Sequence, residues 1–122
     1  MDIPLANQGE EIMYIQVNIG RNFVAARYNA TGGTLSDLEW SEFQEDVKYA
    51  LVQFREHSDM GDPKAEVHCG VGVWDEKEEM SAHISLFHEG GFDTDGLKNY
   101  LFGLKGMYSQ ESIAIILGSQ LI

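Results

Sequence analysis

The chain has 122 residues with 8 basic and 20 acidic side chains, a formal net charge of -12. One domain is expected, because domains usually run about 100–150 residues. Strong acidity argues against nucleic acid and anionic membranes as direct partners, since both attract clustered Lys and Arg. The sequence lacks both a signal peptide and the roughly 20-residue apolar run of a membrane span, and its single Cys69 cannot form an internal disulfide. These features predict a cytoplasmic protein in a reducing compartment.

The N-terminal third contains a leader, a strand and a loop. Residues 1–10 show no hydrophobic period and are predicted to form a flexible leader, which leaves residues 11–122 as a single α+β domain. Apolar and polar residues alternate from Met13 to Ile19, the pattern of a half-buried strand. Residues 21–34 include Asn-Ala-Thr-Gly-Gly and are predicted to be a loop, in which Phe23 to Tyr28 could extend the strand or add a short one.

A capping box marks the start of the first helix. In Ser36-Asp37-Leu38-Glu39 the serine hydroxyl can accept from the amide three residues on, while Glu39 reaches back. Apolar residues then recur at three- and four-residue spacing and predict a helix that ends near His57. The expected buried stripe is Trp40, Phe43, Val47, Ala50, Leu51 and Phe54.

The second half predicts two strands, a helix and a final strand. Residues 65–74 and 80–88 alternate as strands, and the charged residues 75–79 form the turn between them. A second helix is expected from Thr94 to Gly106. Its buried stripe would be Leu97, Tyr100, Leu101 and Leu104. An almost wholly apolar strand over residues 112–118 follows.

The order strand, helix, strand, strand, helix, strand predicts a ferredoxin-like split βαβ fold. One four-stranded antiparallel sheet would carry both helices on one face. Right-handed crossovers place the strands in the spatial order 4-1-3-2. One side of every strand is apolar and should face the helices. The other side would be open.

The open face carries the residues that we expect to bind a ligand or partner: Tyr14, Asn18, His68, Trp74, His83, Ser85 and Phe87. A turn at residues 75–79 would set His83 opposite Gly70 or Val71, with His68 as a diagonal neighbour at roughly 7–8 Å. An aromatic-rich open face is typical of an interface. The leading interpretation is therefore a non-enzymatic protein that forms a homodimer through this face and binds a second protein or a small ligand.

Two alternatives belong to other functional classes. A small dimeric α+β-barrel enzyme could use His68 or His83 as general base, in a cavity lined by Trp74, Phe87 and Tyr14. An acidic patch on the first helix, formed by Glu39, Glu42, Glu45 and Asp46, could mimic the phosphate backbone of DNA, although a solvated helix face is the simpler explanation.

Neither a metal nor a cofactor is predicted. The spacing of Glu66, His68 and His83 is not diagnostic of a metal site. The Gly-Gly pairs lack the frame of a phosphate loop. Cys69 falls on the apolar side of its strand, where a thiol is usually inert packing.

Several short motifs resemble those of a known group of proteins. They are Gly20-Arg21-Asn22, Leu35-Ser36-Asp37-Leu38-Glu39-Trp40 with Phe43, Gly72-Val73-Trp74 and Ser81-Ala82-His83-Ile84-Ser85. From Met13 onward the chain resembles small proteins encoded by bacteriophages of actinobacteria and, more distantly, a bacterial family of small ferredoxin-like domains. The resemblance implies a small accessory protein that acts inside an infected host cell, so the expected protein partner is a host protein.

Overall fold

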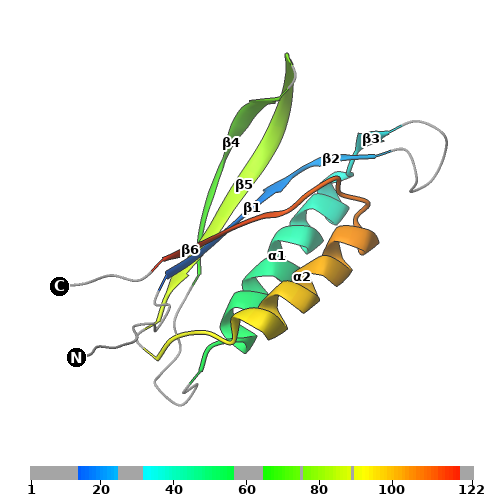
Figure 1. Cartoon of the computed structure of the whole chain (residues 1–122). Coiled ribbons are helices and arrows are strands. Elements are labelled where there is room, and N and C mark those ends of the chain that lie inside the picture. Colours follow the sequence, from blue (N-terminus) through cyan, green and yellow to red (C-terminus); the bar gives the residue numbers. More distant parts are fainter. Residues whose placement is uncertain (1–13, 25–31, 57–64, 75, 89, 119–122) are drawn as a thin grey trace.

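A computed structural model describes residues 14–24, 32–56, 65–74, 76–88 and 90–118 (Figure 1). The predicted leader, residues 1–10, lies outside the described residues. The elements in chain order are β1 (Tyr14–Gly20), β2 (Asn22–Phe23), β3 (Gly33–Thr34), α1 (Asp37–Gln53), β4 (Glu66–Trp74), β5 (Lys77–Phe87), α2 (Thr94–Met107) and β6 (Ala114–Gly118).

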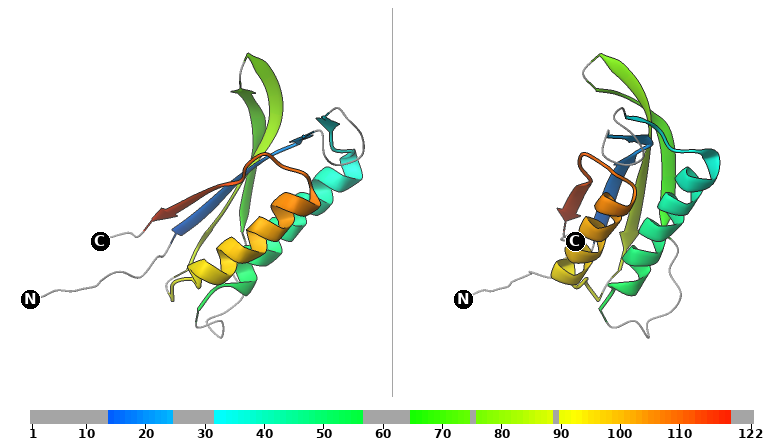
Figure 2. Two further views of the ribbon diagram at one scale, coloured as in Figure 1. Left: turned by 45° about the vertical axis from the view of Figure 1, so that its right-hand side comes forward. Right: turned by 90° about the vertical axis from the view of Figure 1, so that its right-hand side faces the viewer.

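The main sheet has the predicted order. Its strands lie side by side as β4-β5-β1-β6, all antiparallel, which is the order 4-1-3-2 read from the other edge. Both helices cover the same face of the sheet and leave the opposite face open (Figure 2). The predicted α+β class and ferredoxin-like arrangement are therefore confirmed. In the described residues, no helix has the length and apolar character needed to cross a membrane.

The two helices begin with side-chain caps. Ser36 accepts from the amide of Glu39 at 3.1 Å, and Glu39 accepts from the amide of Ser36 at 3.2 Å, so the predicted capping box is present. α1 ends at Gln53, earlier than the predicted end near His57, which lies outside the described residues. The N-cap of α2 is Asp93 rather than the predicted Thr94, because the Asp93 carboxylate accepts from the amide of Gly96 at 3.0 Å.

The core lies between the sheet and the helices. Alternate residues of β1 and β5 are buried and meet the apolar stripes of α1 and α2, as predicted. The largest fully buried side chains are Phe43, Ile15, Leu35, Leu51, Ile84, Leu97, Leu101, Val17 and Val47. Tyr108, just after α2, stacks on Phe43 with ring centroids 4.3 Å apart and donates its hydroxyl to Asp46 at 2.6 Å.

The turn between β4 and β5 is shorter than predicted. Trp74 pairs with Lys77, so β5 begins three residues earlier than expected and a two-residue turn replaces the predicted turn over residues 75–79. Glu76 adopts a left-handed φ of 63°, which such tight hairpin turns require. The predicted register was therefore wrong: His83 pairs directly with His68, not with Gly70 or Val71.

The β4–β5 hairpin extends beyond the helices (Figures 1 and 2). The apolar side of its outer half therefore lies beyond the helices and is exposed: Val71 is 62% exposed and Val73 is 73% exposed. Cys69 is also exposed, with its Sγ 3.7 Å from Oε1 of Gln44, so the prediction that this thiol is buried was wrong. The apolar side of the sheet exceeds the area that two helices can cover.

Arg21 joins β1 to the start of α1. Its guanidinium donates to the carbonyl of Leu35 at 2.7 Å and to Oδ1 of Asp37 at 2.6 Å. In the segment predicted as a loop, β2 and β3 form a short second sheet, in which Asn22 pairs with Thr34. Most of the strand extension considered for Phe23 to Tyr28 falls on residues 25–31, outside the described residues.

Candidate functional site

The open face brings together most of the side chains predicted for it. Rows of paired residues cross the sheet, and His68, His83 and Asn18 share one of them. His68 and His83 are both exposed, and Nε2 of His68 lies 3.4 Å from Oε1 of Glu66. Trp74 ends β4, but its side chain is not among the described ones. The imidazoles of His68 and His83 thus lie exposed on the open face.

The β1 side of this face is held by a chain of hydrogen bonds. The Tyr14 hydroxyl donates to Oε1 of Gln16 at 2.7 Å, and Nε2 of Gln16 donates to Oδ1 of Asn18 at 2.9 Å. Phe87, which is 57% exposed, lies against Tyr14 with ring centroids 4.8 Å apart. One end of the open face is therefore aromatic and apolar, while its middle is polar.

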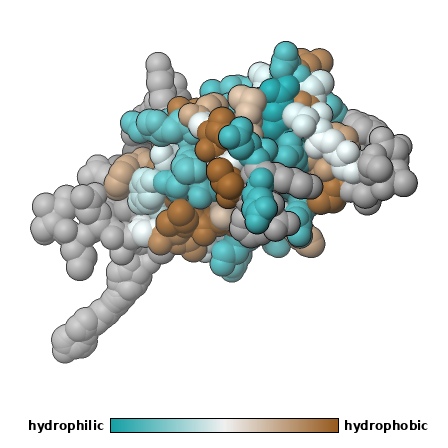
Figure 3. Space-filling view, turned by 90° about the horizontal axis from the view of Figure 1, so that it is seen from above, coloured by the Kyte–Doolittle hydropathy of each residue, from teal (hydrophilic) through white to brown (hydrophobic). Residues whose placement is uncertain are grey.

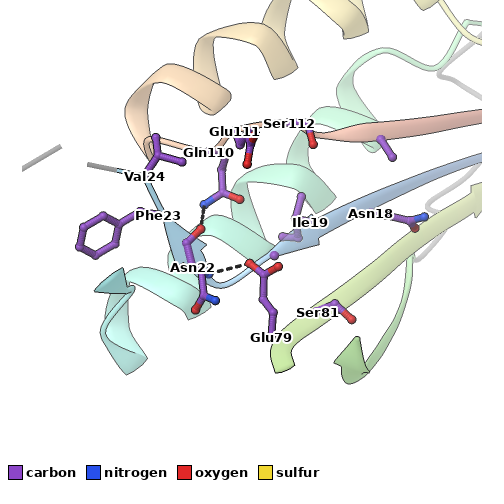
Figure 4. Close-up of a pocket in the computed structure, with 12 residues that line it drawn as sticks. Asn18, Ile19, Asn22, Phe23, Val24, Glu79, Ser81, Gln110, Glu111 and Ser112 are labelled. Carbon is purple, nitrogen blue, oxygen red and sulfur yellow. Dashed lines mark hydrogen bonds between the residues drawn. The ribbon is translucent and has the colours of Figure 1, made fainter. Parts of the chain in front are cut away.

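A pocket of about 650 Å³ lies at the other end of β1 (Figure 4). It is formed where β1, β5, the start of β2 and the segment between α2 and β6 meet. Its lining residues are Asn18, Ile19, Gly20, Asn22, Phe23, Val24, Glu79, Ser81, Gln110, Glu111, Ser112 and Ala114. Its volume is within the roughly 300–1,000 Å³ typical of small-molecule sites.

Glu79 is placed in this pocket by its two neighbours. Its Oε2 accepts from the backbone amide of Asn22 at 2.9 Å, shown as a dashed line in Figure 4. The carboxylate lies over Gly20, where a Cβ would be only 2.3 Å from Oε2 of Glu79. A glycine at position 20 therefore makes room for the carboxylate, which keeps further capacity to accept hydrogen bonds.

A buried amide closes the other wall. Gln110 is buried, and its Nε2 donates to the carbonyl of Asn22 at 3.1 Å (Figure 4) and to the carbonyl of Tyr108 at 3.3 Å. It thereby ties the segment after α2 to β2. This linkage positions Glu111 and Ser112 on the wall facing Glu79.

The charge of the pocket has one sign. Glu79 and Glu111 contribute two carboxylates, and the lining residues include neither Lys nor Arg. A concave surface lined by one sign of charge concentrates its potential and attracts ions of opposite sign. The pocket is therefore suited to a small cationic ligand with groups that can hydrogen-bond to Asn18, Ser81 and Ser112.

The predicted acidic patch on α1 has mixed roles. Glu39 belongs to the capping box and Asp46 accepts from Tyr108, so both carboxylates have structural partners. Glu42 is exposed, and Glu45 pairs with Lys48 at 2.7 Å. Within the described residues, no cluster of three His, Cys, Asp or Glu side chains could hold a metal ion.

The sequence predictions found the open face but missed the pocket. Only Asn18 belongs both to the predicted binding residues and to the pocket lining. Glu79 was assigned to a charged turn, whereas it lies in β5 on the open face, opposite Gly72. The one local signal was Gly20 at the end of a strand, since a glycine in a strand often marks a close approach of another group.

Sequence comparisons give no match, either to a protein-family model or to a curated protein. Among solved structures, the chain is similar to a phage SAM lyase in its apo state. The TM-score is 0.51 and the identity is 14%, with 96% of this chain and 92% of that chain covered. At this identity the similarity shows a common fold, extending over nearly the whole of both chains.

Proposed function

We propose that this chain is a phage-type accessory protein that binds SAM, S-adenosylmethionine, in the pocket beside Glu79. The observation that carries the proposal is the Glu79 carboxylate, held by the amide of Asn22 in a pocket whose described lining residues include a second carboxylate and neither Lys nor Arg. The structural neighbour, a phage SAM lyase, supports both the phage origin and this choice of ligand.

The chemistry of SAM matches the lining. The molecule has a permanent sulfonium cation and a net positive charge near neutral pH, which favours a site lined by carboxylates. Its ribose and adenine present hydrogen-bonding groups that Asn18, Ser81 and Ser112 can meet. A pocket of about 650 Å³ has room for a ligand of this size.

Titration calorimetry with SAM tests the proposal. Glu79→Gln keeps the size of the side chain and removes its charge, so the affinity should fall about tenfold or more, in line with about 1.5–3 kcal/mol for a charged interaction. Glu66→Gln is the matched control, because Glu66 is exposed on the same face but outside the pocket. An absence of SAM binding by the wild-type chain, or equal losses in both variants, would refute the proposal.

A second candidate, self-association through the open face, rests on the aromatic end of that face. Phe87 is largely exposed beside Tyr14, and Ile116 of β6 is exposed on the same side. We propose that two sheets pack face to face here, away from the pocket. Phe87→Glu should then convert a dimer to a monomer in native mass spectrometry, whereas a wild-type monomer would contradict the proposal. Binding of a host protein, DNA mimicry and general-base catalysis by His68 or His83 stay predictions.

A further inference from the structure

Two surfaces far apart in the fold are complementary in charge and polarity. The first is the outer half of the β4–β5 hairpin, which we call the hairpin strip. Its members share the side that faces the helices but lies beyond them: Val71, Val73, Glu78 and Met80, with Glu76 in the turn. Figure 3 looks down on this end of the molecule and shows hydrophobic side chains at the surface among hydrophilic ones.

The second surface is a groove between α2 and β6, which we call the lysine groove. It has a volume of about 220 Å³ and is lined by Lys98, Leu101, Phe102, Lys105, Ser112, Ile113 and Ile115. Phe102 is 64% exposed, and Nζ of Lys105 lies 5.5 Å from the centre of its ring. The groove thus has an apolar floor and two cationic side chains at its rim.

The two lysines are unusual in a chain with a net charge of -12. In the part of the chain that the structure describes, Arg21 pairs with Asp37 and Lys48 pairs with Glu45. Among those same residues, neither Lys98 nor Lys105 forms an ion pair with a carboxylate. Two unpaired cations beside an exposed aromatic ring are suited to a partner that offers carboxylates around an apolar centre.

We propose that the hairpin strip of one copy of this chain docks in the lysine groove of a second copy. Val71, Val73 and Met80 would meet the apolar floor, while Glu76 and Glu78 would meet Lys98 and Lys105. A hairpin cannot reach the groove of its own copy, because β4 and β6 are the opposite edges of the sheet. The contact joins two different surfaces, so it builds a closed ring or a filament, except where two copies exchange hairpins and make both contacts with each other.

The contact is independent of SAM binding and differs from face-to-face packing through Phe87. Neither surface includes Glu79, and only Ser112 is shared between the lysine groove and the SAM pocket. The test can therefore fail while the proposed function stands, and the reverse also holds.

Charge reversal on each surface, followed by mixing, tests the contact. In native mass spectrometry at low salt, the wild-type chain should form oligomers, which added salt weakens. Lys98→Glu with Lys105→Glu should weaken association about tenfold or more, and so should Glu76→Lys with Glu78→Lys. A one-to-one mixture of the two variants should associate again, because each unlike pair of copies restores opposite charges. Recovery in the mixture also shows that both variants are folded.

The control is Glu42→Lys with Glu45→Lys, which changes the net charge by the same amount on the outer side of α1 and should leave association intact. A wild-type monomer at every concentration would overturn the proposal. So would an oligomer that survives both reversed variants. An oligomer that separates with Phe87→Glu alone would assign the contact to the open face instead.

Discussion

The variant Gly20→Ala should change the geometry of the pocket strongly and the stability of the fold only slightly. A Cβ at position 20 would lie 2.3 Å from Oε2 and 2.6 Å from Cδ of Glu79, well inside any real contact distance. The atoms it meets are the far end of a flexible side chain, so the carboxylate moves while the strand stays in place. The hydrogen bond from the amide of Asn22 is then lost.

The loss of stability follows from the loss of that one hydrogen bond between Asn22 and Glu79. A hydrogen bond to a charged group contributes about 1.5–3 kcal/mol, and exposure places this one at the lower end. Replacing glycine with alanine raises the free energy of unfolding by about 0.4–1 kcal/mol, because it restricts the unfolded chain. Gly20→Ala should therefore lower the free energy of unfolding by about 1 kcal/mol in urea denaturation. Its affinity for SAM should fall about tenfold or more, as for Glu79→Gln.

Gly72→Ala is the matched control on the other side of β5. Its Cβ would meet the carbonyl of Glu79 and Oγ of Ser81 at 3.9 Å, which is ordinary contact, so both quantities should stay within about 0.5 kcal/mol of wild type. In a chain that already carries Glu79→Ala, the Gly20→Ala change should cost nothing further. Equal effects of the two alanine variants on SAM affinity would refute the reasoning.

Two further predictions concern tyrosines. Tyr108→Phe removes the hydroxyl that donates to the half-buried Asp46, and should lower the free energy of unfolding in urea by about 1–2 kcal/mol. The control Tyr49→Phe, on the exposed side of α1, should lower it by under about 0.5 kcal/mol. Similar losses in the two variants would contradict the role of the hydrogen bond to Asp46. Desolvation, together with the charges of Asp46 and Tyr49, raises the pKa of Tyr100 above its usual 10.0. The unfolded chain then loses this proton first, so stability is fully present below pH 10.0 and falls as the pH rises through the folded pKa. Tyr100→Phe should show a shallower loss across that window, and an unchanged slope would count against the shift.

The sequence predicted both helices, the four strands of the main sheet and their order, because those depend on local patterns. The capping box at Ser36 and the alternation in β1 are local signals, and the structure contains both. The helix N-cap at Asp93 was missed by one residue, because Asp93 and Thr94 are both good capping residues and only the hydrogen bond to Gly96 separates them.

The hairpin register depended on one residue with no sequence signal. Glu76 adopts a positive φ that glycine, asparagine and aspartate usually supply, so a longer charged turn was the natural prediction. That error shifted the partner of His83 by two or three residues. It also kept Glu79 out of the sheet, and so out of the predicted site.

The pocket was unpredictable for a different reason. Its walls come from segments that are distant in the sequence, and Gln110 joins them only once α2 has packed and its amide meets the carbonyl of Asn22. The exposure of the hairpin strip was missed for a similar reason. Alternation in β4 identifies a helix-facing side, but it cannot tell how far along the strand the helices reach.

The position of β1 at the centre of the sheet governs the order of folding. β1 pairs with β5 on one side and with β6 on the other, and Tyr14 at its start lies opposite Gly118 of β6. Closing so long a loop is entropically costly, and contacts that are distant in sequence slow folding. The β4–β5 hairpin needs no such closure, so we expect it to form early. In that order, one edge of β1 stays unpaired until β6 docks on it. We expect the chain to be most prone to pairing with a wrong strand at this stage.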